Sequence, residues 1–134
     1  MNFLVDTHIF IWMFGDTVRF PGKVREFLED VESNQLYFSD ASAWEASIKY
    51  GVGKLHLPET PEMFFPDRVR LAGYRHLQID LRHVTRVYSL PKIHGDPFDR
   101  LLVAQALIED MTIVTNDPVI KSYKSDTLLI GDIS

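Results

Sequence analysis

Phe3-Leu4-Val5-Asp6 is the segment that decides the fold, because three apolar residues of a short buried strand end abruptly in a carboxylate. A helical pattern over residues 7–14 follows directly. An ionised carboxylate at the edge of a hydrophobic core loses water without gaining a partner, and a divalent cation would compensate it. The segment therefore predicts the first strand of an α/β domain with a functional acid at its carboxyl end.

Length and composition narrow the possible classes of protein. The 134 residues fit one domain spanning 1–134, and the hydrophobic (46%) and charged (25%) fractions are those of a globular protein. The absence of cysteine excludes a disulfide framework and a thiolate metal site. A net charge of -5 argues against unspecific binding of nucleic acid over the whole surface, so any such contact must be local.

The sequence shows no targeting or membrane segment. No basic segment followed by an apolar stretch opens the chain, and no run approaches the roughly 18 apolar residues that span a bilayer. We therefore expect a cytoplasmic protein without membrane contact.

Short apolar runs alternate with helical patterns along the chain. The expected strands are 2–5, 36–38, 77–79, 112–114 and 128–130, and the expected helices are 7–14, 24–31, 40–50, 68–72, 81–90, 97–110 and a short one from 118. The proline-rich stretch 58–66 is expected to be mostly turns. Strands joined through helices form parallel sheets that are covered on both faces. The predicted fold class is α/β, with a mostly parallel sheet of about five strands flanked by helices.

Four carboxylates occupy positions that this topology can bring to one edge of the sheet. Asp6 and Asp117 follow strands, Glu45 lies in the helix after the second strand, and Asp99 opens the buried helix before the fourth. Ligands of parallel sheets bind beyond the carboxyl ends of the strands. An all-oxygen site of this kind suits Mg²⁺ or Mn²⁺ and usually serves phosphate chemistry.

Three of these acids also have purely structural interpretations. Asp6 and Asp117 are placed to cap helices, and Asp117 precedes a proline, as helix caps often do. Asp99 stands in the first turn of a helix that Asp96 would cap, where a carboxylate favours the helix dipole. Each acid alone is therefore ambiguous, and their joint placement carries the prediction.

Glu45 has a different alternative. It could form a surface ion pair with Lys49 at the i,i+4 spacing, worth about 0.2 to 0.5 kcal/mol. Ala41 and Ile48 lie on the same face, beside Trp44, and this stripe is expected to face the core. A core-facing position favours a functional Glu45.

Four segments, in this order, resemble the PIN-domain ribonucleases and specifically the VapC-like toxins. The Asp-Pro-Phe-Asp-Arg segment before an apolar helix is the most specific, and the Trp-Glu pair is nearly as specific. The segments are Leu4-Val5-Asp6-Thr7-His8, Ser42-Ala43-Trp44-Glu45 with Gly53-Lys54-Leu55, Asp96-Pro97-Phe98-Asp99-Arg100-Leu101, and Val114-Thr115-Asn116-Asp117. Close relatives often have a basic residue where this chain has Gly95, which removes one expected RNA contact.

The resemblance implies a PIN-like three-layer sandwich and a metal-dependent endoribonuclease that cuts single-stranded or loop RNA, leaving a 5′-phosphate. It makes Asp6, Glu45, Asp99 and Asp117 the acidic pocket, which would hold one or two Mg²⁺ or Mn²⁺ ions. It also implies a cognate antitoxin that presents an Arg or Lys to the pocket, and a homodimer.

Roles within the pocket follow as hypotheses. Asp6 and Asp99 would bind the main ion directly, while Glu45 and Asp117 would bind a second ion or orient water. For contacts with substrate phosphates the candidates are Arg100, Lys49 and Lys54, each with a solvated surface charge as the alternative.

A competing function from another class is a non-catalytic PIN-like domain whose acidic rim binds a basic protein partner. A phosphatase with an aspartyl nucleophile is disfavoured, because it would usually carry a second Asp where this chain has His8. Metal-dependent cleavage of RNA by the pure protein separates the nuclease from the binding domain.

Overall fold

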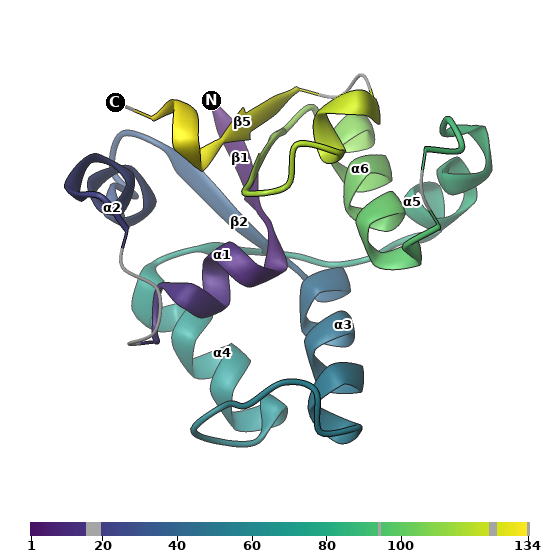
Figure 1. Ribbon diagram of the computed structural model, residues 1–134. Coiled ribbons are helices and arrows are strands. Elements are labelled where there is room, and N and C mark those ends of the chain that lie inside the picture. The colour runs from purple at the N-terminus through teal and green to yellow at the C-terminus, as the bar shows by residue number, and fades with distance from the viewer. Residues whose placement is uncertain (16–19, 94, 124–125, 134) are drawn as a thin grey trace.

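A computed structural model describes residues 1–15, 20–93, 95–123 and 126–133 of the chain (Figure 1). In these residues, five strands form one parallel sheet in the order β3-β2-β1-β4-β5. All four pairings of neighbouring strands are parallel. The strands are β1 (Asn2–Val5), β2 (Gln35–Ser39), β3 (Arg75–Leu77), β4 (Thr112–Thr115) and β5 (Thr127–Leu129). The predicted α/β class with a parallel sheet of five strands is confirmed.

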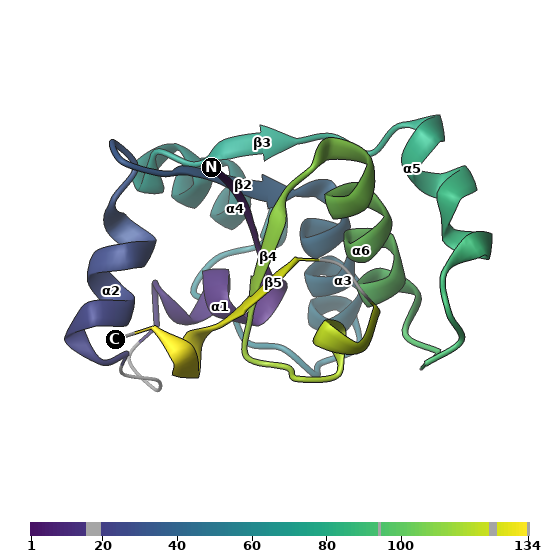
Figure 2. The ribbon, with the colours of Figure 1, turned by 90° about the horizontal axis from the view of Figure 1, so that it is seen from above.

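Helices cover both faces of this sheet, as the view from above shows (Figure 2). The α-helices are α1 (Thr7–Trp12), α2 (Gly22–Glu29), α3 (Asp40–Gly51), α4 (Pro61–Ala72), α5 (Leu81–Arg86) and α6 (Pro97–Glu109). Within the described residues, 3₁₀ turns lie at η1 (Val87–Ser89), between α5 and α6, and at η2 (Ile120–Tyr123) and η3 (Ile130–Asp132), after β4 and β5. No helix in the described part of the chain is long and apolar enough to cross a membrane.

The central strand β1 contributes to two hydrophobic cores, one on each face of the sheet. Phe3 and Val5 join the cluster beneath α2 and α4, whereas Leu4 joins the cluster beneath α6. All three are at most 6% exposed. Side chains alternate between faces along a strand, so a strand buried on both faces must be apolar throughout. This is why Asp6, the first charged residue after β1, marks the edge of the sheet.

Helix α6 lies in the interior, as its apolar sequence predicts. Every residue from Leu101 to Ala106 is buried, including Gln105. Asp96 caps the helix by accepting hydrogen bonds from the N–H groups of Phe98 and Asp99. The cap fixes where α6 begins and therefore where Asp99 stands.

The middle of the chain departs from the prediction. Helix α4 begins at Pro61 and contains Pro66, although residues 58–66 were expected to be mostly turns. Proline is tolerated in the first turn of a helix, and burial of Phe64 and Phe65 against the core offsets the interior proline. Strand β3 pairs two residues earlier than the expected 77–79, although α4 ends at Ala72 as expected. The helix expected over 81–90 ends at residue 86 and continues as η1, and the short helix expected from 118 is the 3₁₀ turn η2.

The stripe expected on the core side of α3 is also wrong in part. Trp44 and Ile48 are 53% and 45% exposed, and Trp44 packs edge-on against the ring of Phe98. The buried residues of α3 are Ala41, Ser42, Glu45 and Ala46. The core-facing stripe is rotated away from Trp44 and Ile48, and α3 packs against α1, α4 and α6. Glu45 itself is buried, as predicted.

Candidate active site

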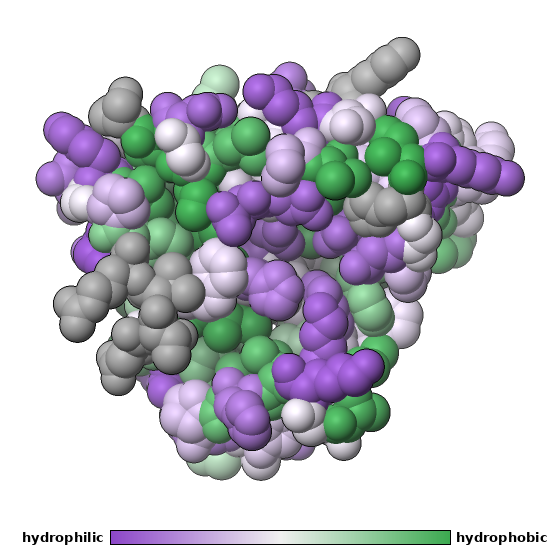
Figure 3. Space-filling view, in the orientation of Figure 1, coloured by the Kyte–Doolittle hydropathy of each residue, from purple (hydrophilic) through white to green (hydrophobic). Residues whose placement is uncertain are grey.

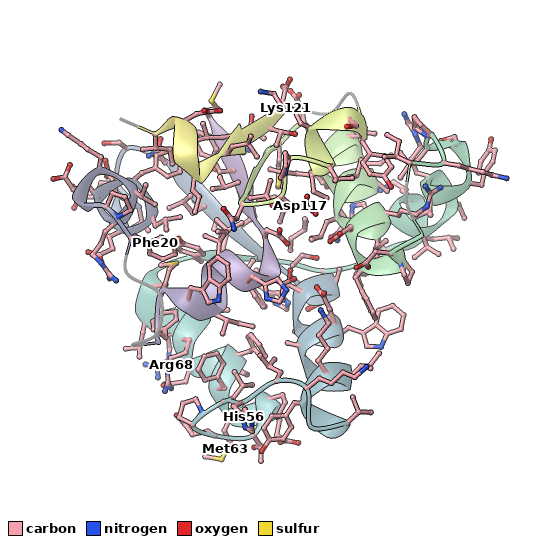
Figure 4. All side chains as sticks on the ribbon, viewed as in Figure 1. Phe20, His56, Met63, Arg68, Asp117 and Lys121 are labelled. Atoms are coloured by element: carbon pink, nitrogen blue, oxygen red, sulfur yellow. The ribbon has the colours of Figure 1, made fainter. Side chains whose placement is uncertain are left out.

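The candidate site lies where the chain leaves the two neighbouring strands β1 and β4. From β1 the sheet continues to β2 and β3 on one side and to β4 and β5 on the other, so the strand order reverses here. Such a switch point opens a crevice beyond the carboxyl ends of the strands. Asp117 projects toward this region, near the start of α1 (Figure 4), and hydrophilic residues cover the same part of the surface (Figure 3).

Asp6 is only 8% exposed and uses both carboxylate oxygens. Oδ1 accepts a hydrogen bond of 2.7 Å from the main-chain N–H of Thr7, which caps α1. Oδ2 accepts a hydrogen bond of 2.7 Å from the hydroxyl of Thr115. Burial raises the pKa of Asp6, and these two hydrogen bonds oppose the rise. The capping role considered for Asp6 is therefore real, and the same side chain also bonds Thr115 at the end of β4.

Glu45 reaches the same place from α3. Its Oε1 accepts a hydrogen bond of 2.8 Å from the hydroxyl of Thr7, and its Oε2 forms an ion pair of 2.7 Å with Nζ of Lys49. The i,i+4 pair with Lys49 exists, but the Glu45 side chain is 4% exposed, so the pair is not the surface contact of the alternative interpretation. Thr7 thus connects Asp6, through its main chain, with Glu45, through its side chain.

Asp117 is connected to Asp6 through Thr115, at the end of β4. Its N–H donates a hydrogen bond of 3.0 Å to the hydroxyl of Thr115, which itself donates to Asp6. Its Oδ1 accepts a hydrogen bond of 2.9 Å from the N–H of Val119, which orders the turn before η2. Thr7, through its N–H and its hydroxyl, and Thr115, through its hydroxyl, therefore link three of the four predicted acids.

Asp99 is close enough to the other acids to be affected by their charge. Burial, and after it the negative charges of Asp6, Asp96, Glu45 and Asp117, raise the pKa of Asp99 from 3.8 to about 7. All four acids predicted from the sequence therefore share one electrostatic environment. Asp96, the cap of α6, adds a fifth negative charge that we had predicted only as a cap.

The donor chemistry of this cluster fits a hard divalent cation, because every ligand atom offered is a carboxylate oxygen and the like charges repel one another. In the part of the chain described, however, no three His, Asp or Glu side chains are arranged to hold a metal ion as they stand. The oxygens of Asp6 and Glu45 are instead turned to Thr7, Thr115 and Lys49. Ion binding would require some of these carboxylates to exchange partners.

Of the three cationic residues predicted to contact substrate, Lys49 lies in the cluster. The guanidinium of Arg100 donates hydrogen bonds to the main-chain carbonyls of Val87 and Pro91, at 3.1 and 2.8 Å, and so holds η1 against α6. Lys54 is exposed in the turn after α3. The phosphate contacts of Arg100 and Lys54 stay predictions.

Sequence reasoning did not assign the roles of Thr7 and Thr115, which are 1% and 0% exposed. Each stands within two positions of a predicted acid, in Asp6-Thr7 and Thr115-Asn116-Asp117. A hydroxyl beside an acid at the end of a buried strand is the signal that could have identified them.

The sequence matches the PIN domain family over residues 3–125. Ribonuclease VapC16 of Mycobacterium tuberculosis (strain ATCC 25618 / H37Rv) is 41% identical over 61 residues, which are 46% of this chain and 43% of the relative, so less than half of the relative's length is matched. Among solved structures, VapBC2 from Rickettsia felis, bound to a promoter DNA fragment, aligns with a TM-score of 0.69 at 19% identity, covering 96% of this chain and 98% of that chain. VapBC-1 from nontypeable Haemophilus influenzae aligns with a TM-score of 0.69 at 15% identity, covering 98% and 100%. At these identities the structural likeness establishes the fold.

Proposed function

The chain belongs to the PIN-domain family, and from this premise we propose that it is a metal-dependent endoribonuclease acting on single-stranded or loop RNA, the toxin of a toxin–antitoxin pair. One observation carries the proposal: Thr7 joins the carboxylates of Asp6 and Glu45, and Thr115 joins the carboxylate of Asp6 to the main chain of Asp117, at the switch point of the sheet. Like charges gathered in a partly buried site oppose folding, and proteins keep such arrangements mainly at functional sites.

The proposed cofactor is Mg²⁺ or Mn²⁺. When bound, such an ion stabilises the charge that develops on a phosphate and lowers the pKa of the attacking water. Asp6 and Asp99 would hold the main ion, and Glu45 and Asp117 would hold a second ion or orient the water. Thr7 and Thr115 act as positioning residues, since their hydroxyls fix the orientation of Glu45 and Asp6.

The toxin role is supported by the partial match to a VapC ribonuclease and by structural neighbours that are VapBC complexes. We propose a cognate antitoxin that blocks the pocket with an Arg or Lys, because a carboxylate cluster at a partly desolvated rim favours such a side chain. A homodimer and a cytoplasmic location complete the proposal. Inhibition of cleavage by the purified antitoxin would test the pairing.

The decisive experiment is RNA cleavage by the pure protein and its Asp6→Asn variant, with Mg²⁺, Mn²⁺ or chelator. Asparagine caps a helix as well as aspartate does, so α1 keeps its cap while a negatively charged ligand is lost. We expect cleavage to fall at least about 100-fold, with thermal stability in chelator unchanged or improved. Asp110→Asn is the matched control, because Asp110 is exposed and its φ of 55° suits asparagine.

Two results would contradict this proposal. Cleavage that persists in Asp6→Asn would remove Asp6 from the chemistry. Absence of cleavage with every metal would favour the non-catalytic domain that binds a basic protein through its acidic rim.

A further inference from the structure

Lys49 forms the ion pair that occupies Glu45. Its Nζ lies 2.7 Å from Oε2 of Glu45, one turn earlier on α3. The Glu45 side chain is 4% exposed whereas that of Lys49 is 37% exposed, so the ammonium reaches a buried carboxylate from the solvent side. Asp96 and Asp99 also attract this ammonium. Lys49 therefore neutralises part of the negative charge of the whole cluster.

The second oxygen of Glu45 has a different kind of partner. Oε1 accepts its hydrogen bond from the neutral hydroxyl of Thr7. A neutral donor can stay in place beside a cation, whereas an ammonium and a divalent cation at one carboxylate repel each other. Oε2 is thus the oxygen at which the protein's own cation and an added cation exclude each other.

From this geometry we propose that Lys49 is a built-in counter-ion that competes with the divalent cation for Glu45, so that loading the site opens the Lys49–Glu45 ion pair. The inference rests on the proposed function, since it concerns the same acidic cluster. It accounts for the oxygen of Glu45 that the ammonium occupies in the metal-free protein. It makes Lys49 a positioning residue whose ammonium is released toward the rim when the cation binds.

The Lys49–Glu45 ion pair and the bound cation compete for one oxygen, so each weakens the other by the same factor. A substitution that removes the ammonium should therefore tighten cation binding. In the metal-free protein, truncation of Lys49 should lower stability. It leaves a buried carboxylate without its counter-charge beside Asp6 and Asp99, and an unpaired buried charge is strongly destabilising. A merely structural lysine would lower stability in both states.

The test is calorimetric titration of Mn²⁺ alone into wild type, Lys49→Met and Lys49→Arg, with melting temperatures in chelator and in saturating Mn²⁺. We expect Lys49→Met to melt lower in chelator, to bind Mn²⁺ about tenfold more tightly and to recover most of its stability in Mn²⁺. Lys49→Arg should stay near wild type. The control is Lys23→Met, the same loss of charge at an exposed pair with Glu26 on α2.

The same substitution in a Glu45→Gln variant tests whether the effect of Lys49 acts through its ion pair with Glu45. In Glu45→Gln, which keeps the size of the side chain, the added Lys49→Met change should no longer tighten Mn²⁺ binding beyond the effect of Lys23→Met. Unchanged or weaker Mn²⁺ binding in Lys49→Met, with wild type binding normally, overturns the inference and leaves the proposed function standing. No Mn²⁺ binding by any variant overturns both. Binding of Mn²⁺ by Lys49→Met but not by wild type would support the inference most strongly.

Discussion

The hydroxyl of Thr115 donates a hydrogen bond of 2.7 Å to the carboxylate of Asp6, which lies 109 positions earlier in the chain. The bond joins the carboxyl ends of β4 and β1, the two strands at the switch point. The same hydroxyl accepts a hydrogen bond of 3.0 Å from the N–H of Asp117. A single buried oxygen therefore sets the positions of two predicted ligands.

Replacing Thr115 with valine keeps the shape of the side chain and removes this oxygen. Asp6 loses a donor while buried, so we expect the free energy of unfolding to fall by about 1 to 3 kcal/mol. We also expect RNA cleavage to fall more than about tenfold, because Asp6 and Asp117 lose their shared anchor. Thr112→Val, at the other end of β4, is the control. Equal activity of the two variants would exclude the positioning role of Thr115.

Asp99 gives the stability of the metal-free protein a predictable dependence on pH. Its pKa is raised from 3.8 to about 7 in the folded state, chiefly by burial, so the folded protein binds this proton more tightly than the unfolded chain. The contribution of Asp99 to the free energy of unfolding is therefore fully present below about pH 4 and is lost as the pH rises through about 7. We expect the melting temperature in chelator to fall between pH 5 and pH 8 by a few degrees more in wild type than in Asp99→Asn.

The variant should consequently melt above wild type at pH 8 and close to it at pH 5. Asp6, whose pKa burial also raises, contributes in the same direction to both proteins, so the difference between them isolates Asp99. Parallel pH profiles of the two proteins would show that Asp99 is ionised without penalty.

Arg100 serves as a clamp on the segment before α6. Its guanidinium donates to the carbonyls of Val87 and Pro91, so Arg100→Met should lower the free energy of unfolding by about 1 to 3 kcal/mol in urea titrations. Arg25→Met breaks an exposed pair with Glu29 and should cost about 0.5 kcal/mol or less. RNA affinity of Arg100→Met, measured well below its melting temperature, decides whether the predicted phosphate contact exists in addition.

Gly73 ends α4 in the left-handed conformation, with a φ of 72°. An added Cβ would also meet Cγ2 of Val31 at 3.3 Å, so Gly73→Ala should destabilise the protein by about 1 kcal/mol or more. Gly51→Ala is the matched control, because space around Gly51 is open and its φ is not positive. We expect that control to be neutral or slightly stabilising in thermal melts. Equal melting temperatures would contradict the strain argument.

The sequence predicts best where burial alone determines structure. The run Phe3-Leu4-Val5 and the apolar helix after Asp96 contact the core on nearly all sides, so their composition suffices to identify them. The beginning of α4 was harder to predict, because its two prolines locally favour turns while the segment is helical. Only packing of Phe64 and Phe65 against the core settles that conflict, and such tertiary contacts are not encoded locally.

The site shows the same division. The order of the acids along a parallel sheet allowed Asp6, Glu45, Asp99 and Asp117 to gather, and the resemblance to PIN-domain ribonucleases completed that prediction. Their partners were harder to foresee, because the bonds of Thr7 to Glu45 and of Thr115 to Asp6 span 38 and 109 positions. Trp44 was misplaced because helical spacing gives a face but not which neighbouring helices cover it.

The central place of β1 has a consequence for biosynthesis. Translation delivers β1 and Asp6 first, yet β1 pairs on one side with β4, whose residues and the following Asp117 emerge far later. Until the ribosome has passed that point, β1 has one open edge and the pocket lacks an anchor. A nascent or prematurely terminated polypeptide that lacks β4 therefore cannot form the bond between Thr115 and Asp6 or complete the acidic cluster.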